Sequence, residues 1–218
     1  DGCYVHDARK RAGAFLAEKY KIDADIVIGV PDSGLDAALG YSQASGIPYG
    51  IGFLKNKYIG RTFIAPDQKM REDRVKIKLN VIASAVRGKR VILVDDSIVR
   101  GTTSRPIVKQ LRDAGAKEVH FLSSAPKFLN PCYYGTDIDS RENLIACHYS
   151  EEEIAKIIGA DSVGYLDLAH AGLVSGGDSS GFCCACFDGA YPTEIPENPQ
   201  KSRFERPLSE NPKFQKKD

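Results

Sequence analysis

Short apolar runs alternate with longer amphipathic stretches along the first 124 residues. Apolar residues spaced three and four apart predict helices, whereas short, continuous, β-branched runs are typical of buried parallel strands. The predicted helices cover residues 6–20, 35–45 and 103–114, and the predicted strands cover residues 25–30, 49–54, 90–95 and 118–124. Because these elements form two β-α-β units, we expect an α/β fold built on a doubly wound, mostly parallel sheet.

The connection over residues 55–89 breaks this pattern. It has little periodicity, and residues 54–90 contain eleven Lys or Arg against three acidic residues. Loops of this length inside compact domains are commonly lids or binding loops. We expect a flexible basic lid that closes over a negatively charged ligand, with a solvated basic surface as the alternative.

The chain changes character again after residue 130. Short helices are expected over residues 140–146 and 150–158, and cysteines gather near residue 185. The expected organisation is a ligand-binding core over residues 1–130, a peripheral cysteine-rich region over residues 131–191 and an irregular tail over residues 192–218.

The most informative segment is VILVDDSIVRGTTS, at residues 91–104. Asp95 and Asp96 end a predicted central strand, at the edge where open α/β sheets bind their ligands. Gly101 and several hydroxyl residues then lead into a helix whose N-terminus favours an anion. A carboxylate pair beside an anion loop suits a sugar phosphate. Receiver domains and Walker B sites also carry Asp-Asp after a strand, and hydroxyl-rich turns are often simple caps, but no GxxxxGK(S/T) motif accompanies the pair.

Another polar loop, Pro-Asp-Ser-Gly at residues 31–34, follows the first predicted strand. The carboxyl ends of parallel strands share one edge of the sheet, so we expect the two loops to lie near each other. Their carboxylate and hydroxyl oxygens suit Mg²⁺, which takes few protein ligands together with water and substrate phosphates. A plain proline turn, with Asp32 or Ser33 capping the next helix, is the alternative.

The cysteines have metal-ligand spacing. Cys183 and Cys186 form a CxxC pair, and Cys132 lies in a turn-rich stretch before it. Zinc sites and iron-sulfur clusters normally take four protein ligands, so a fourth is needed, from His148, His170 or a cysteine before Asp1. Free buried cysteines are the alternative.

Composition excludes some classes of protein. The net charge is +1 and 42% of residues are hydrophobic, which argues against a general nucleic-acid-binding surface. No segment has the apolar length of a membrane helix and no signal peptide opens the chain, so we expect a cytoplasmic protein without nucleic-acid or membrane partners. Met70 is the only methionine, so we expect residues before Asp1.

Residues 91–104 resemble the phosphoribosyl pyrophosphate (PRPP) motif of type I phosphoribosyltransferases. With other segments, they resemble the glutamine phosphoribosylpyrophosphate amidotransferases, in the branch that carries a 4Fe-4S cluster. The other matching segments are Pro48-Tyr49, KNKYIGRTFI at residues 55–64, GAKEVH at residues 115–120, Pro131-Cys132 and CFxGxYP at residues 186–192. The resemblance extends over nearly the whole chain up to Ile195.

The resemblance implies transfer of ammonia, drawn from glutamine, to PRPP, giving 5-phosphoribosylamine and pyrophosphate in the first step of purine synthesis. The implied catalytic residues are Asp95, Asp96, Lys57, Tyr58 and Arg61. The implied PRPP-binding residues are Asp32, Ser33, Gly34, Asp95, Asp96, Ser97, Val99, Arg100, Gly101, Thr102, Thr103 and Ser104. The implied Mg²⁺ ligands are Ser33, Asp95 and Asp96.

The same resemblance implies a cluster held by Cys132, Cys183 and Cys186, with the fourth ligand upstream of this chain. It also implies a homo-oligomer, feedback inhibition by purine nucleotides and an N-terminal glutaminase domain that this chain lacks. Two alternatives remain open. One is a phosphoribosyltransferase that uses a nucleobase, and the other is a PRPP-sensing regulator without catalysis.

Overall fold

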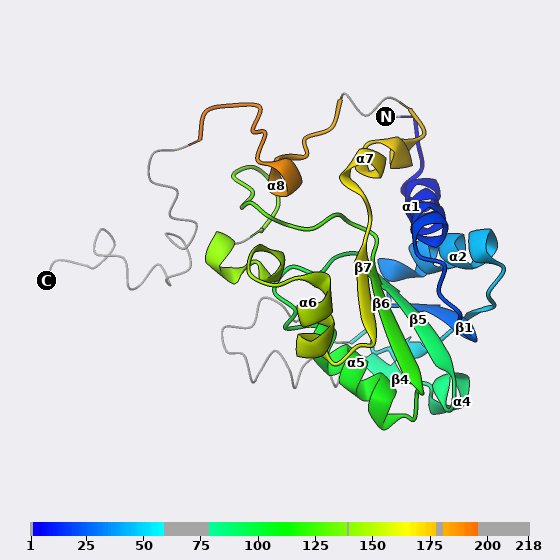
Figure 1. Ribbon diagram of the computed structural model, residues 1–218. Helices are drawn as coiled ribbons and strands as arrows, with labels where there is room; N and C mark the ends of the chain where they lie inside the picture. Colours follow the sequence, from blue (N-terminus) through cyan, green and yellow to red (C-terminus); the bar gives the residue numbers. More distant parts are fainter. Residues whose placement is uncertain (1, 59–78, 139, 178–180, 196–218) are drawn as a thin grey trace, which may run out of the picture.

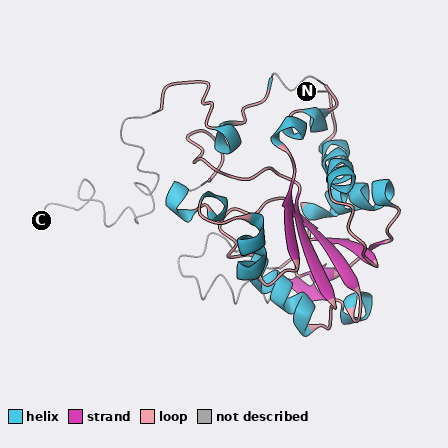
Figure 2. Ribbon diagram, in the orientation of Figure 1, coloured by secondary structure: helices cyan, strands magenta, loops and turns pink. Residues whose placement is uncertain are grey.

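A five-stranded parallel sheet forms the centre of the protein (Figures 1 and 2). The computed structural model describes residues 2–58, 79–138, 140–177 and 181–195. The strands lie in the order β2, β1, β5, β6, β7, and each neighbouring pair is parallel. Their bounds are Ile26–Gly29 (β1), Tyr49–Gly50 (β2), Arg90–Asp95 (β5), Glu118–Ser123 (β6) and Ser162–Tyr165 (β7). The α/β fold with a mostly parallel sheet is confirmed.

Helices cover both faces of the sheet, as expected of a doubly wound fold. One face carries α1 (Val5–Lys19) and α2 (Gly34–Ser45). The other face carries α4 (Ala83–Val86), α5 (Ser104–Asp113) and α6 (Glu151–Ile158). The remaining short helices are η1 (Arg141–Asn143), η2 (Ile145–Cys147), α7 (Leu168–Ala171), η3 (Leu173–Ser175) and α8 (Ala185–Asp188).

Alternation along β5 builds two hydrophobic clusters. Val91 and Leu93 join the first cluster, which lies on the side of α5 and α6, while Ile92 and Val94 join the second, on the side of α1 and α2. All four side chains are fully buried. A strand buried on both faces is continuously apolar, which is the pattern that predicted it.

Glycines bring α1 and α2 unusually close. A Cβ on Gly13 would lie 1.9 Å from the carbonyl oxygen of Ala37, and a Cβ on Gly40 would lie 2.0 Å from that of Lys10. Because no other residue fits at either position, this contact fixes α2 and therefore the loop before it.

The predicted strand over residues 49–54 is wrong as a single element. β2 ends at Gly50, and β3 (Phe53–Lys55) pairs antiparallel with β4 (Leu79–Val81) in a separate two-stranded sheet. β4 and α4 both lie in the stretch expected to be an irregular lid. The chain leaves the main sheet after Gly50 and passes close to β1 at Gly52, where a Cβ would lie 2.5 Å from Ile28 Cδ1. An apolar run in the sequence does not reveal such a tertiary contact.

Part of the region expected to be peripheral instead completes the main sheet. β7 pairs with β6, and α6, which begins at the capping box of Ser150 and Glu153, packs on the first cluster. β7 escaped prediction because it is short and contains Gly164, where a Cβ would lie 2.6 Å from the ring of Tyr20. The single helix predicted over residues 140–146 is two 3-10 helices, η1 and η2.

A third, smaller cluster lies beyond the carboxyl ends of the strands. It is centred on the buried side chains of Phe128, Ile138 and Leu144. Val99, Cys132 and other partly buried residues pack against it. No helix in the described part of the chain is long and apolar enough to cross a membrane.

Candidate functional site

Two carboxylates lie at the carboxyl end of β5. Asp95 is the last residue of the strand, and its Oδ1 accepts a 2.8 Å hydrogen bond from the N–H of Asp96. The hydroxyl of Ser97 donates to Asp96 Oδ1 at 3.3 Å. Burial, and then the neighbouring charge of Asp96, raise the pKa of Asp95 well above its ordinary value. Such a pair is costly without a ligand and favours a metal cation or hydroxyl groups.

The second loop, residues 96–103, wraps from these carboxylates to the start of α5. Ile98 is 1% exposed and anchors the loop in the first cluster. Gly101 is buried and has φ +74°, a conformation that favours glycine. Thr103 precedes α5 without a side-chain capping bond. The Arg105 N–H donates to the Gly101 carbonyl at 3.1 Å and Pro106 has no N–H, so an anion at this helix start would use the N–H of Ser104 and those of the loop before it.

The implied ligands in this loop have different surroundings. Arg100 and Thr103 are exposed, and Thr102 is half-buried. Ser104 is 2% exposed within the first turn of α5. The side chain of Val99 packs against the third cluster and its carbonyl accepts from Ile145, so neither group is available to a ligand.

The first loop, residues 31–34, lies directly beside the end of β5. The peptide between Pro31 and Asp32 is cis, and Gly34 opens α2. A Cβ on Gly34 would lie 2.3 Å from the carbonyl oxygen of Val94 and 3.2 Å from the Cα of Asp95. The two loops therefore share one edge of the sheet, as parallel strands predict.

Lys55 places a positive charge beside the first loop. Its ammonium forms an ion pair with the carboxylate of Asp32, which joins the end of β3 to this loop. Lys57 and Tyr58 are exposed close by along the chain, and Arg61 lies outside the described residues. The sequence predicts no separate role for Lys55 within the KNKYIGRTFI segment. Only its contact across the fold distinguishes it from the other basic residues of that stretch.

The cysteines lie around the third cluster. Cys132 and Cys186 pack against it, whereas Cys183 is exposed. The N–H groups of Leu129 and Asn130 donate to the Cys186 carbonyl at 2.9 and 3.0 Å, which joins the two cysteine-bearing segments. Burial, and then Cys132, raise the pKa of the Cys186 thiol to about 11.

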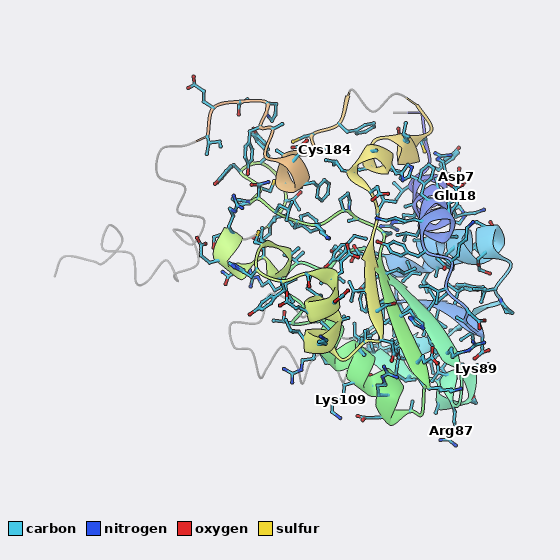
Figure 3. The ribbon with its side chains drawn as sticks, viewed as in Figure 1. Asp7, Glu18, Arg87, Lys89, Lys109 and Cys184 are labelled. Atoms are coloured by element: carbon cyan, nitrogen blue, oxygen red, sulfur yellow. The ribbon has the colours of Figure 1, made fainter. Side chains whose placement is uncertain are left out.

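No three His, Cys, Asp or Glu side chains in the described ranges are placed to hold a metal ion. The described cysteines do not, therefore, form a cluster site by themselves. Cys132, Cys183 and Cys186 remain a predicted ligand set. In Figure 3, Cys184 lies beside α8, at the opposite end of the molecule from Arg87 and Lys89, which precede β5.

Several known proteins are similar to this chain. The amidophosphoribosyltransferase of Methanocaldococcus jannaschii is 54% identical over 195 residues, covering 89% of this chain and 41% of that protein. The Bacillus subtilis amidophosphoribosyltransferase is 53% identical over 201 residues, covering 89% and 42%. The chain thus spans about two-fifths of the length of these relatives.

A solved structure has the same fold. The B. subtilis glutamine PRPP amidotransferase complexed with ADP and GMP superposes with a TM-score of 0.80 at 50% identity, covering 91% of this chain and 44% of that one. The phosphoribosyl transferase domain model matches residues 5–140. That match includes both loops and every strand of the main sheet except β7, so the chain belongs to the phosphoribosyl transferase domain family.

Proposed function

We propose that this chain binds PRPP with Mg²⁺ and transfers ammonia to it, giving 5-phosphoribosylamine and pyrophosphate. The observation that carries the proposal is the approach of the two loops, in which only a glycine fits at residue 34 against Val94. A substrate with phosphate groups at both ends of a sugar needs two such loops, one for each end.

The second loop would hold the 5-phosphate at the start of α5, while Asp95 and Asp96 hold the ribose hydroxyls. Ser33 and the first loop would hold the pyrophosphate, with Lys55 neutralising its charge. In the reaction a nitrogen–C1 bond forms, the bond between C1 and the pyrophosphate oxygen breaks, and the ammonia nitrogen loses a proton. Positive charge develops on the sugar near the carboxylates, and negative charge leaves beside Lys55.

Mg²⁺ would be held by Asp95, Asp96 and Ser33. Its positive charge would stabilise the negative charge of the leaving pyrophosphate. The carboxylate pair fits this ion, because its like charges lack compensation and its oxygens are the ligand type that Mg²⁺ prefers. Lys57, Tyr58 and Arg61 are proposed to close over the bound substrate.

A turnover assay tests the reaction. The whole protein is incubated with PRPP, Mg²⁺ and ammonia, and phosphoribosylamine and pyrophosphate are measured. Formation of both supports the proposal. Efficient nucleotide formation from a free purine or orotate would favour a nucleobase phosphoribosyltransferase, and PRPP binding without turnover would favour a sensor.

The proposal extends to the whole protein. A glutaminase domain would supply ammonia from glutamine, purine nucleotides would inhibit at the phosphate-binding loops, and the protein would be a cytoplasmic homo-oligomer. The complex of the B. subtilis relative with ADP and GMP supports the nucleotide part.

The 4Fe-4S cluster is proposed on the family resemblance, with Cys132, Cys183 and Cys186 as three of its ligands. The influence of Cys132 and Cys183 on the pKa of Cys186 supports a shared neighbourhood for these thiols. Iron and sulfide analysis of the anaerobically purified whole protein tests this. About four irons per chain support the cluster, and an active, iron-free protein would exclude it.

A further inference from the structure

The second loop rests against a wall formed by residues 144–147. The N–H of Ile145 donates a 2.9 Å hydrogen bond to the carbonyl of Val99. The side chain of Ile145 also lies against the loop, because a Cβ on Gly101 would lie 2.9 Å from Ile145 Cδ1. Ile145 therefore contacts the loop at two points, the carbonyl of Val99 and the side of Gly101 where other residues carry a Cβ.

Loop and wall divide their side chains between the same two clusters. In the loop, Ile98 lies in the first cluster and Val99 packs against the third. In the wall, Ile145 lies in the first cluster and Leu144, which is fully buried, lies in the third. The loop cannot rotate about its axis without removing an apolar side chain from one cluster, which costs free energy.

We propose that Ile145 is a positioning residue, which holds the second loop in the conformation that binds the 5-phosphate. This inference rests on the proposed function, in which the second loop binds the 5-phosphate. Ile145 acts through Val99 and Gly101. A glycine has wide conformational freedom, so the loop needs an external wall to stay ordered before its ligand arrives.

Two ligands separate the two loops experimentally. Ribose 5-phosphate probes the second loop, and pyrophosphate with Mg²⁺ probes the first. In the whole protein, Ile145→Ala is expected to raise the Kd for ribose 5-phosphate about tenfold, while the Kd for pyrophosphate stays within about twofold. The KM for PRPP rises by a similar factor, and kcat stays within about threefold.

Leu111→Ala is the matched control. Leu111 is fully buried in the same first cluster, on α5, so its truncation lowers stability without opening the wall. This variant is expected to bind ribose 5-phosphate as the wild type does. Ile145→Val removes one methyl group, so its Kd for ribose 5-phosphate is expected to rise measurably but less than that of Ile145→Ala. If Ile145→Ala does not fold, an unchanged Kd in Ile145→Val overturns the inference.

Three results would overturn the inference: unchanged ribose 5-phosphate affinity in Ile145→Ala, equal weakening of both ligands, or the same weakening in Leu111→Ala. A wild-type protein that binds neither ligand would instead overturn the proposed function. Calorimetric titration of wild type and variants at one temperature distinguishes these outcomes.

Discussion

The two ends of β5 carry opposite electrostatics. At its start, Arg90 forms ion pairs with Asp23 and Asp25, and the Asp25 carboxylate also accepts from the Arg90 N–H at 2.8 Å. These hydrogen bonds lower the pKa of Asp25 to about 2. At its end, Asp95 lies beside another carboxylate, and its pKa is raised.

The difference separates an edge whose ion pairs stabilise the fold from the edge that we propose binds the substrate, called the binding edge below. Charges at the amino edge are already paired within the chain, as they are again where Arg112 meets Asp161. At the carboxyl edge, Asp32 is paired with Lys55, whereas Asp95 and Asp96 have no basic partner among the described residues. Six residues of one strand thus join a stabilising ion-pair group to a destabilising carboxylate pair.

The largest effect is expected from Asp96→Asn at the binding edge. Loss of this charge should lower kcat about 10³-fold, because charge that develops in the reaction is no longer stabilised. The free energy of unfolding should change by less than about 0.5 kcal/mol, since the side chain is exposed. Asp113→Asn, on the exposed face of α5, is the control for both assays. Near-normal turnover in Asp96→Asn would contradict the assigned role.

Gly34→Ala tests whether the binding edge depends on the approach of the two loops. The new Cβ would meet the Val94 carbonyl, so the loops must separate, at a cost of about 1–3 kcal/mol. Thermal unfolding and PRPP titration should both show the change. Gly135→Ala adds a methyl where nothing lies within 4 Å and should be silent. Equal stability and PRPP affinity in the two variants would show that the loops tolerate a methyl group at residue 34.

Asp25→Asn tests the stabilising edge. The folded-state pKa of Asp25 is lower than its ordinary 3.8, so its ion pair stabilises the fold above pH 4. That stability is lost as the pH falls through about 2. The variant should therefore unfold at a lower temperature near neutral pH, and the difference from wild type should shrink toward pH 2. A difference that does not depend on pH would indicate another cause.

Asp95→Asn should have a small effect on stability, of opposite sign to that of Asp25→Asn. Because the folded-state pKa of Asp95 is raised, the folded protein loses stability as the pH rises above the ordinary value of 3.8. Without Mg²⁺, the variant should unfold at a slightly higher temperature than wild type at neutral pH. The gain should vanish below pH 4. A lower melting temperature at neutral pH would contradict the comparison.

Local patterns made most of the sheet and the second loop predictable. β5 is continuously apolar because both its faces are covered, and Asp95, Asp96 and Gly101 follow it within a few residues. The end of a parallel strand is also a known place for ligands. A site whose residues are close together in the sequence can be predicted from the sequence alone.

The parts that escaped prediction depend on contacts between distant segments. Lys55 reaches Asp32 only because the chain leaves the main sheet after Gly50 and forms β3 in a separate sheet. Ile145 reaches Val99 only because the chain returns to the core before α6 and β7. β7 itself carries Gly164, a poor strand former that close packing against Tyr20 requires. In these cases, tertiary packing overrides local preference.

The hydrogen bond between Val99 and Ile145 also bears on the order of events during synthesis. When the growing chain has reached the end of β6, the first four strands of the main sheet and both loops have been made, yet the wall is still missing. The second loop can reach its final form only after residues 144–147 have emerged and closed back on it, which is a long-range step in folding. The second loop thus matures later than its own residues are made, because it waits for residues 144–147.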